Sequence, residues 1–214
     1  MPGVGTLSIP PPPGPRETFL DAAATVAGLV DRIPLDAYAG PGLGVWDLRA
    51  LVGHTGRSLV TVATYLAQRA LCVDIPSPQA YYVAIAHAGG AGGEAVAERG
   101  RAAGAALGPD PAKTFREWVG AAEDALSRAA DDDPVPTFAG GMHVADYLPT
   151  RTFELAVHGA DIAAATGLDV QFAPSVLADA AALAARIAVE LGAGPALLAA
   201  LTGRAPLPVG FSVV

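Results

Sequence analysis

Apolar residues recur at helical spacing through most of this chain, and no series of segments shows the strict alternation expected of a β-sheet. Helical spacing gathers the apolar side chains on one face of an α-helix, and that face has to be buried against another element. Prolines, glycines and short polar stretches separate the periodic segments. The sequence therefore predicts an all-α protein, built on an antiparallel four-helix bundle with extra helices towards the C-terminus.

Residues that start or stop helices mark the limits of several segments. Asp47 and Asp110 are predicted N-caps, and Gly167 is a predicted C-cap. Glycines are costly within a helix, so the glycine-rich stretch 89–93 predicts a break or the close approach of another backbone. The expected helices are 18–32, 46–69, 78–107, 110–130, 144–166, 175–191 and 195–202.

The length of 214 residues suits one domain with short appendages. We expect a disordered or extended arm at 1–15, a helical bundle at 16–203 and a tail at 204–214. The N-terminus lacks the basic and then apolar order of a signal peptide, and charged residues interrupt the most apolar region, 176–201. We therefore expect a cytoplasmic protein with no membrane partner.

Composition removes several classes of function. The formal net charge of -8 at pH 7, without basic clusters, argues against binding to nucleic acid. The single cysteine, Cys72, excludes an intramolecular disulfide and a cysteine-rich zinc site, and we interpret it as a small buried residue. The sequence also lacks a phosphate-binding loop, a dinucleotide-binding glycine motif and the Gly-x-Ser-x-Gly motif of many hydrolases.

The segment from Arg151 to Asp161 places a carboxylate and an imidazole four residues apart. In a helix this spacing puts Glu154 and His158 on one face, one turn apart. His54 lies in an earlier predicted helix, at the edge of its apolar stripe. If the two helices face each other, two imidazoles and one carboxylate can bind Zn²⁺, Fe²⁺ or Ni²⁺ and leave positions open for water or substrate.

The same residues also have a simpler interpretation. Arg151 and Glu154 could form a surface ion pair on a solvated helix face, and such a pair is worth less than about 1 kcal/mol. His54 could equally be a structural residue at the edge of a helix.

Three further residues each have two interpretations. Asp161 could orient the ring of His158 from behind a metal, or it could form an ordinary salt bridge. His87 and His143 could be spare ligands, although a surface or capping role suits each of them better.

Two stretches of the chain resemble a known family. Residues 45–54, which end at His54, and residues 151–167, which carry Arg151, Glu154, His158 and Asp161, are similar to the mycothiol-dependent maleylpyruvate isomerase N-terminal family. The closing stretch 201–208 is also similar, and the resemblance covers about residues 17–210. The family belongs to the DinB-like superfamily of metal-binding four-helix bundles, so the resemblance implies a DinB-like fold.

The resemblance further implies a site and a chemistry. It implies that His54, Glu154 and His158 bind a divalent metal, usually Zn²⁺, and that a low-molecular-weight thiol, mycothiol in actinobacteria, is the cosubstrate. A bound cation lowers the pKa of a thiol as it lowers that of water, and the thiolate adds to a small electrophile. In an isomerase the adduct rotates and the thiol leaves, whereas in a transferase the thiol stays on the product.

Characterised isomerases of this family carry a further C-terminal domain that supplies an arginine to the site. The present sequence has a short tail after the predicted bundle, so we expect a substrate other than maleylpyruvate. Arg57, Arg151 and Arg204 are alternatives for binding an anionic substrate, and Arg151, the nearest on the helical wheel, is our candidate catalytic residue.

Two other functions fit the same residues. A non-catalytic bundle could bind a small apolar ligand in its cleft, and a metal-dependent hydrolase would use bound water without a thiol. Metal content separates the binding protein from the two enzymes, and thiol dependence separates the enzymes from each other. The apolar segment 175–191 favours a homodimer surface, with core packing as the alternative.

Overall fold

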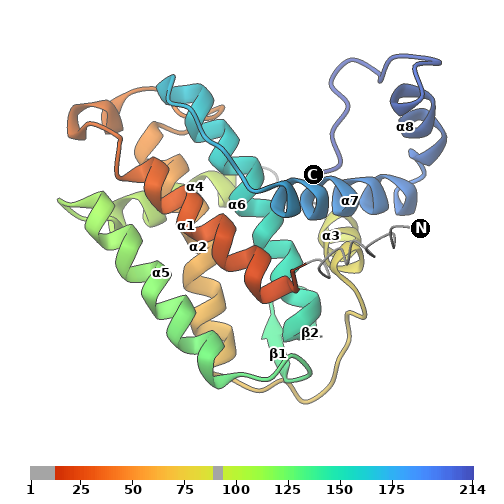
Figure 1. Ribbon diagram of the computed structural model, residues 1–214, viewed down its shortest axis with the longest axis horizontal. Helices are drawn as coiled ribbons and strands as arrows, with labels where there is room; N and C mark the ends of the chain where they lie inside the picture. The colour runs from red at the N-terminus through yellow and green to blue at the C-terminus, as the bar shows by residue number, and fades with distance from the viewer. Residues whose placement is uncertain (1–12, 89–93) are drawn as a thin grey trace, which may run out of the picture.

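The computed structural model describes residues 13–88 and 94–214, and helices dominate these residues (Figure 1). The all-α class is therefore confirmed. Most of the predicted arm at 1–15 lies outside the described residues, and so does the predicted helix break at 89–93. The helices are α1 (Pro15–Val30), the short 3-10 helix η1 (Leu35–Ala39), α2 (Leu48–Leu66), α3 (Pro78–His87), α4 (Glu94–Ala106), α5 (Pro111–Arg128), α6 (Val144–Thr166), α7 (Pro174–Glu190) and α8 (Gly194–Leu201).

The helices α1, α2, α5 and α6 form the predicted four-helix bundle, in which each helix packs against two of the others (Figure 1). α2 and α6 are antiparallel, because His54 contacts His158 while Tyr65, further along α2, contacts Tyr147 at the opposite end of α6. α1 and α5 are also antiparallel. Arg16, in the first turn of α1, donates hydrogen bonds to backbone carbonyls at the C-terminal end of α5.

α2 and α5, in contrast, run in the same direction. Gly56 lies against the ring of Trp118, and about two turns further along α2, Ala63 lines a cavity together with Ala125 of α5. The connection between these two helices contains α3 and α4 and returns the chain to its starting end. A long crossover allows parallel neighbours in a bundle, whereas a short loop forces antiparallel ones.

α4 packs very closely against the outside of α2. A Cβ atom added to Gly53 would lie 2.3 Å from the backbone nitrogen of Gly104, and one added to Gly104 would lie 2.9 Å from the Cα of Ala50. Distances this short leave no space for a methyl group, so glycine allows the two backbones to approach. The contact lies beside His54, which follows Gly53 in the chain.

The predicted helix ends are confirmed at several positions. The side chain of Asp47 accepts a hydrogen bond from the backbone N–H of Ala50 at 2.7 Å, and that of Asp110 accepts one from Lys113 at 3.0 Å. α6 ends at Thr166, and its C-cap Gly167 has a φ of 69°, in the left-handed region that favours glycine.

A short β-hairpin between α5 and α6 was not predicted. Its strands, β1 (Pro134–Thr137) and β2 (Gly140–His143), pair antiparallel, and β2 leads directly into α6. The loop after α2 packs against this hairpin, since the N–H groups of Asp74 and Ile75 both donate to the carbonyl of Gly141. The hairpin therefore anchors both the start of α6 and the approach to α3.

Cys72 lies in the same loop, and the prediction that it is buried is wrong. Its side chain is exposed, and its thiol donates a hydrogen bond to Asp74 at 3.1 Å. Because the loop runs over the surface, a small apolar side chain at this position has no core to enter.

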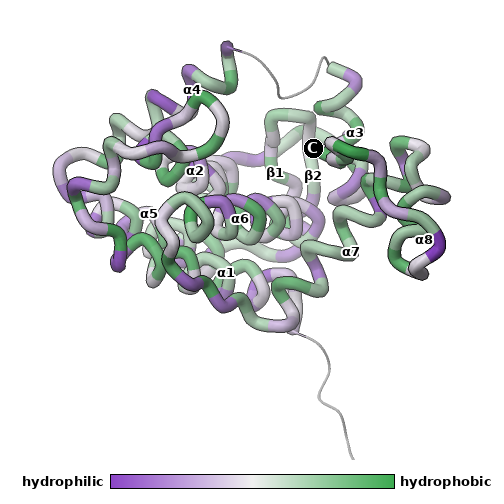
Figure 2. The backbone as a smooth tube through the Cα atoms, turned by 90° about the horizontal axis from the view of Figure 1, so that it is seen from above, coloured by the Kyte–Doolittle hydropathy of each residue, from purple (hydrophilic) through white to green (hydrophobic). Residues whose placement is uncertain are grey.

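α7 and α8 lie beside the bundle rather than within it, and α8 forms the outer edge (Figure 2). α7 packs against α6 and α3, and its side chains Val176, Leu183 and Ile187 are buried. α8 buries no residue. Within residues 13–88 and 94–214, no helix combines the length and the apolar character that crossing a membrane requires.

Candidate metal centre

The structure brings His54, Glu154 and His158 together. Each offers a ligand atom, and these atoms all lie within 4.8 Å of one another. His54 comes from α2 and the other two residues from α6, so the site spans the antiparallel contact between the two helices. The predicted metal site depended on these two helices facing each other, and in the structure they do.

On the α2 side, His54 is held by aromatic rings. Its ring stacks on the indole of Trp46 with centroids 4.5 Å apart, and it meets the ring of His158 edge-on at 5.0 Å. The indole Nε1 of Trp46 in turn donates to the carbonyl of Ala97 on α4. Nδ1 of His54 is buried and has no hydrogen-bond partner among the described residues, so the ring retains an unused ligand atom.

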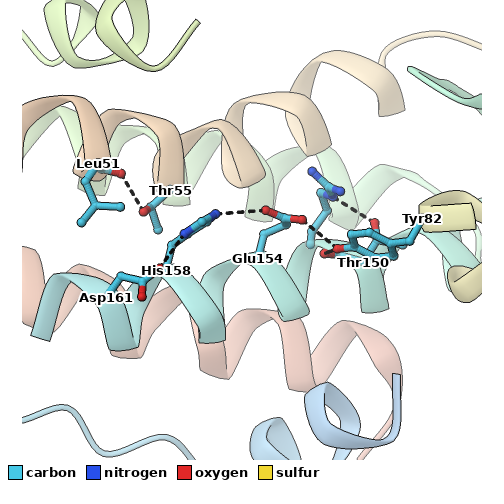
Figure 3. A network of polar contacts seen from close by, with 8 residues as sticks. Leu51, Thr55, Tyr82, Thr150, Glu154, His158 and Asp161 are labelled. Atoms are coloured by element: carbon cyan, nitrogen blue, oxygen red, sulfur yellow. Dashed lines mark hydrogen bonds and ion pairs between the residues drawn. The ribbon is translucent and has the colours of Figure 1, made fainter. Parts of the chain in front are cut away.

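On the α6 side, His158 lies between two carboxylates (Figure 3). Its Nδ1 is 3.0 Å from Oδ2 of Asp161, and its Nε2 is 3.3 Å from Oε2 of Glu154. The contact with Asp161 fixes the orientation of the ring and directs Nε2 towards Glu154. The structure therefore places Asp161 where the sequence predicted a residue that orients the imidazole.

Glu154 has a second partner that the sequence did not reveal. The hydroxyl of Tyr82, on α3, donates to Oε1 of Glu154 at 2.8 Å and also lies 3.0 Å from the carbonyl of Thr150 (Figure 3). Tyr82 is 72 positions from Glu154 and belongs to a different helix. No local spacing in the sequence indicates such a contact.

The three candidate ligands have very different proton affinities. Burial and the neighbouring His158 lower the pKa of His54 to about 4. Burial alone would also lower the pKa of His158, but hydrogen bonds to Asp161 and Glu154 raise it to about 9. Burial would raise the pKa of Glu154, but the hydrogen bond from His158 and the charge of Arg151 lower it to about 2. Glu154 is therefore a carboxylate at neutral pH.

Arg151 lies one turn before Glu154 and is only 8% exposed. Its Nε donates to Oγ1 of Thr150 at 2.9 Å, and its guanidinium carbon lies 5.2 Å from the ring centres of both Tyr81 and Tyr147. Among the described residues, Arg151 has no carboxylate within ion-pair distance. The alternative of a solvated face with a surface ion pair between Arg151 and Glu154 is therefore wrong, because Arg151 is buried beside Tyr81 and Tyr147.

The other predicted candidates lie elsewhere. His87 is exposed in the last turn of α3, and His143 precedes α6 with Nδ1 2.8 Å from the carbonyl of Asp132. Neither belongs to the group of convergent side chains. The preference for surface and capping roles at these two positions agrees with the structure.

The donor set, and the spacing of one ligand pair, fit a divalent cation. Two ligand atoms at about 2.0–2.1 Å from one tetrahedral Zn²⁺ are separated by about 3.3–3.4 Å. The distance of 3.3 Å between Nε2 of His158 and Oε2 of Glu154 has this value. Two imidazoles and one carboxylate also form the ligand set of many catalytic zinc sites, which leave a fourth position open.

A comparison with protein families identifies residues 19–163 as a mycothiol maleylpyruvate isomerase N-terminal domain. This match covers more than half of the 214 residues. The chain belongs to that family. Comparisons with curated proteins and with solved structures each gave no match.

Membership of the mycothiol maleylpyruvate isomerase N-terminal family confirms the resemblance inferred from the two sequence blocks. The matched region runs from α1 to the last turn of α6 and includes His54, Glu154 and His158. It ends before α7 and α8, so the similarity of the closing stretch 201–208 lies outside it. The bundle is thus the part that matches the family, and the three convergent side chains lie within it.

Proposed function

We propose that this protein is a divalent-metal-dependent enzyme that activates a low-molecular-weight thiol. The thiol either adds to a small electrophile and stays on the product, or adds and leaves to isomerise it. The convergence of His54, Glu154 and His158 across α2 and α6, in a member of this family, is the observation that carries the proposal. By family resemblance the thiol is mycothiol, and the donor set favours Zn²⁺.

The protein residues have distinct roles in this proposal. His54, Glu154 and His158 would hold the cation, which when bound lowers the pKa of a thiol and so supplies thiolate near neutral pH. Asp161 keeps the ring of His158 turned so that Nε2 is available as a ligand. The ring of Trp46 covers one side of His54 and limits the access of water there.

Arg151 supplies a fixed positive charge near the same place. A guanidinium cannot lose its proton in a protein, and this one has no carboxylate partner among the described residues. An anionic group on the electrophile would complete its ion pairing. We therefore propose Arg151 as the residue that binds the anionic end of the substrate, in preference to Arg57 and Arg204.

The first test is metal content, measured by elemental analysis of tag-free protein after reconstitution with Zn²⁺. We expect close to one equivalent of zinc in the parent protein and a loss of most of it in His54→Ala and His158→Ala. His87→Ala is the matched control and should retain the metal, since His87 is exposed on α3 and outside the site.

The second test is thiol dependence of the zinc-loaded protein. Consumption of an electrophile that requires mycothiol and is lost in His158→Ala supports the proposal. A protein without metal would contradict it and favour a non-catalytic binding protein. A protein that binds metal and hydrolyses substrates without a thiol would instead be a hydrolase that uses bound water.

A further inference from the structure

The contact between Tyr82 and Glu154 gives the two oxygens of this carboxylate different environments. The Tyr82 hydroxyl carries one proton but lies near two acceptors, Oε1 of Glu154 at 2.8 Å and the carbonyl of Thr150 at 3.0 Å. That carbonyl lies inside α6, where it accepts the helical hydrogen bond from the N–H of Glu154. The carboxylate oxygen is closer and charged, so the proton is donated to Oε1.

The second oxygen, Oε2, has a different environment. It lies 3.3 Å from Nε2 of His158, on the side of the carboxylate where the two imidazoles converge (Figure 3). Oε1 of Glu154 is therefore hydrogen-bonded to Tyr82 of α3, and Oε2 faces the two candidate histidine ligands. A carboxylate held in this way presents one oxygen rather than two.

The position of Tyr82 is fixed by its packing. Its side chain is 7% exposed and meets the rings of Tyr81 and Phe153 edge-on, each with centroids 5.4 Å apart. A buried ring between two others loses little further freedom when its hydroxyl forms a hydrogen bond. The hydroxyl therefore restrains Glu154 rather than following its movements.

We propose that Tyr82 is a positioning residue, which restricts Glu154 to binding the metal through Oε2 alone. This inference rests on the proposed function, because it requires that a metal binds. With one oxygen from Glu154 and one nitrogen from each of two histidines, a tetrahedral cation has three protein ligands and one position for a thiol. If Oε1 were released, it could bind beside Oε2 as an additional ligand and raise the coordination number above four.

The test uses the same substitution, tyrosine to phenylalanine, at two adjacent positions. Tyr82→Phe removes the hydroxyl and keeps the ring. Tyr81→Phe is the matched control, because Tyr81 is adjacent, is similarly buried at 6% exposure, and makes no hydrogen bond to Glu154. Each protein is loaded with Co²⁺, whose visible absorption is intense for four ligands and weaker when the coordination number rises.

We expect the parent protein and Tyr81→Phe to give the same intense four-coordinate spectrum. Tyr82→Phe should give a band at least two-fold weaker per bound Co²⁺. Identical spectra in all three proteins would overturn the role of Tyr82 and leave the proposed metal site intact. A parent protein that binds no Co²⁺ would overturn both the proposed function and this inference.

A measurement on the parent protein alone covers the case in which Tyr82→Phe does not fold. X-ray absorption of the zinc-loaded protein distinguishes a carboxylate bound through one oxygen from one bound through two. We expect one oxygen. A carboxylate bound through both oxygens in the parent protein would contradict the proposal directly.

Discussion

At the scale of single residues, the two histidines of the site lie in contact and yet differ in charge. The nearest carboxylates accept hydrogen bonds from His158, which is protonated at neutral pH in the absence of a cation, whereas His54 stays neutral. A cation at this site has to displace the proton of His158. Metal affinity should therefore fall as the pH is lowered.

The metal-free protein should be most stable near pH 6.5. The pKa of His158 is raised to about 9, so its stabilisation is complete below the ordinary value of 6.5 and is lost as the pH rises through 9. The pKa of His54 is lowered to about 4, so stability is lost as the pH falls from 6.5 towards 4. Urea unfolding at several pH values in the presence of a chelator measures both limbs.

Two variants show which histidine causes the loss of stability above pH 6.5, the alkaline limb, and which causes the loss below it, the acidic limb. His158→Gln should flatten the alkaline limb, and His54→Gln should flatten the acidic limb. A free energy of unfolding that rises steadily from pH 6.5 to pH 9 in the metal-free parent would contradict the role of His158.

Arg151 permits a prediction about substrate selection. Removing a hydrogen bond between charged groups costs about 1.5–3 kcal/mol, which corresponds to a factor of about ten to a hundred. Arg151→Gln should therefore lower kcat/KM for a carboxylate-bearing electrophile by about that factor relative to its carboxamide analogue. Arg57→Gln removes an equal charge from α2 and should leave the ratio unchanged, and an equal loss in both variants would argue for a general charge effect.

At the scale of helices, the close approach of α2 and α4 depends on glycine. A methyl group on Gly53 would overlap the backbone of α4, so Gly53→Ala should lower the free energy of unfolding by about 1–3 kcal/mol. Gly28, inside α1, has no atom within 4 Å of the corresponding position, and Gly28→Ala should raise stability by up to about 1 kcal/mol. Chemical unfolding of both variants checks the difference, and equal effects would contradict the packing argument.

The helices could be predicted from sequence because their determinants are local. Asp47, Asp110 and Gly167 act within one turn of their own position, and α6 begins and ends where its sequence pattern does. The hairpin at 134–143 escaped prediction because its strands have four residues each and contain prolines and glycines, which are rare in strands. Contacts with the loop after α2 and the burial of Val135 and Met142 stabilise it there.

The same distinction applies to the site: residues with a local signal could be predicted, and residues whose role depends on packing could not. Glu154, His158 and Asp161 could be predicted because they lie on one helix at fixed spacing. His54 could be predicted from its place at the edge of an apolar stripe and from the family pattern around it. Tyr82 could not, since its role depends on how α3 packs against α6. The burial of Arg151 also depends on tertiary structure, because Tyr81 of another helix, α3, packs against its guanidinium.

At the scale of the whole molecule, the last helix carries exposed apolar side chains. α8 buries no residue, and Leu198 and Leu201 are 64% and 75% exposed. Exposed apolar surface of this kind is typical of association surfaces. The homodimer surface was predicted on 175–191, but Val176, Leu183 and Ile187 are buried, so we now place this prediction on α8. The division of the chain at residues 16 and 203 also stays a prediction.

Light scattering coupled to size-exclusion chromatography tests the dimer. We expect the parent protein to elute as a dimer and the double variant Leu198→Glu, Leu201→Glu as a monomer with unchanged zinc content. Because these leucines lie outside the bundle, the substitutions should alter association without altering the fold. A monomeric parent protein would contradict the prediction.

The stacking of Trp46 on His54 also has an optical consequence. The chain has only two tryptophans. The other, Trp118 of α5, packs against Gly56 of α2 and against Phe115 of its own helix. In a Trp118→Phe background, the fluorescence of the remaining indole would come from a ring in contact with a candidate ligand. Protonation or coordination of that imidazole would change the emission, so the protein carries its own spectroscopic reporter of events at the site.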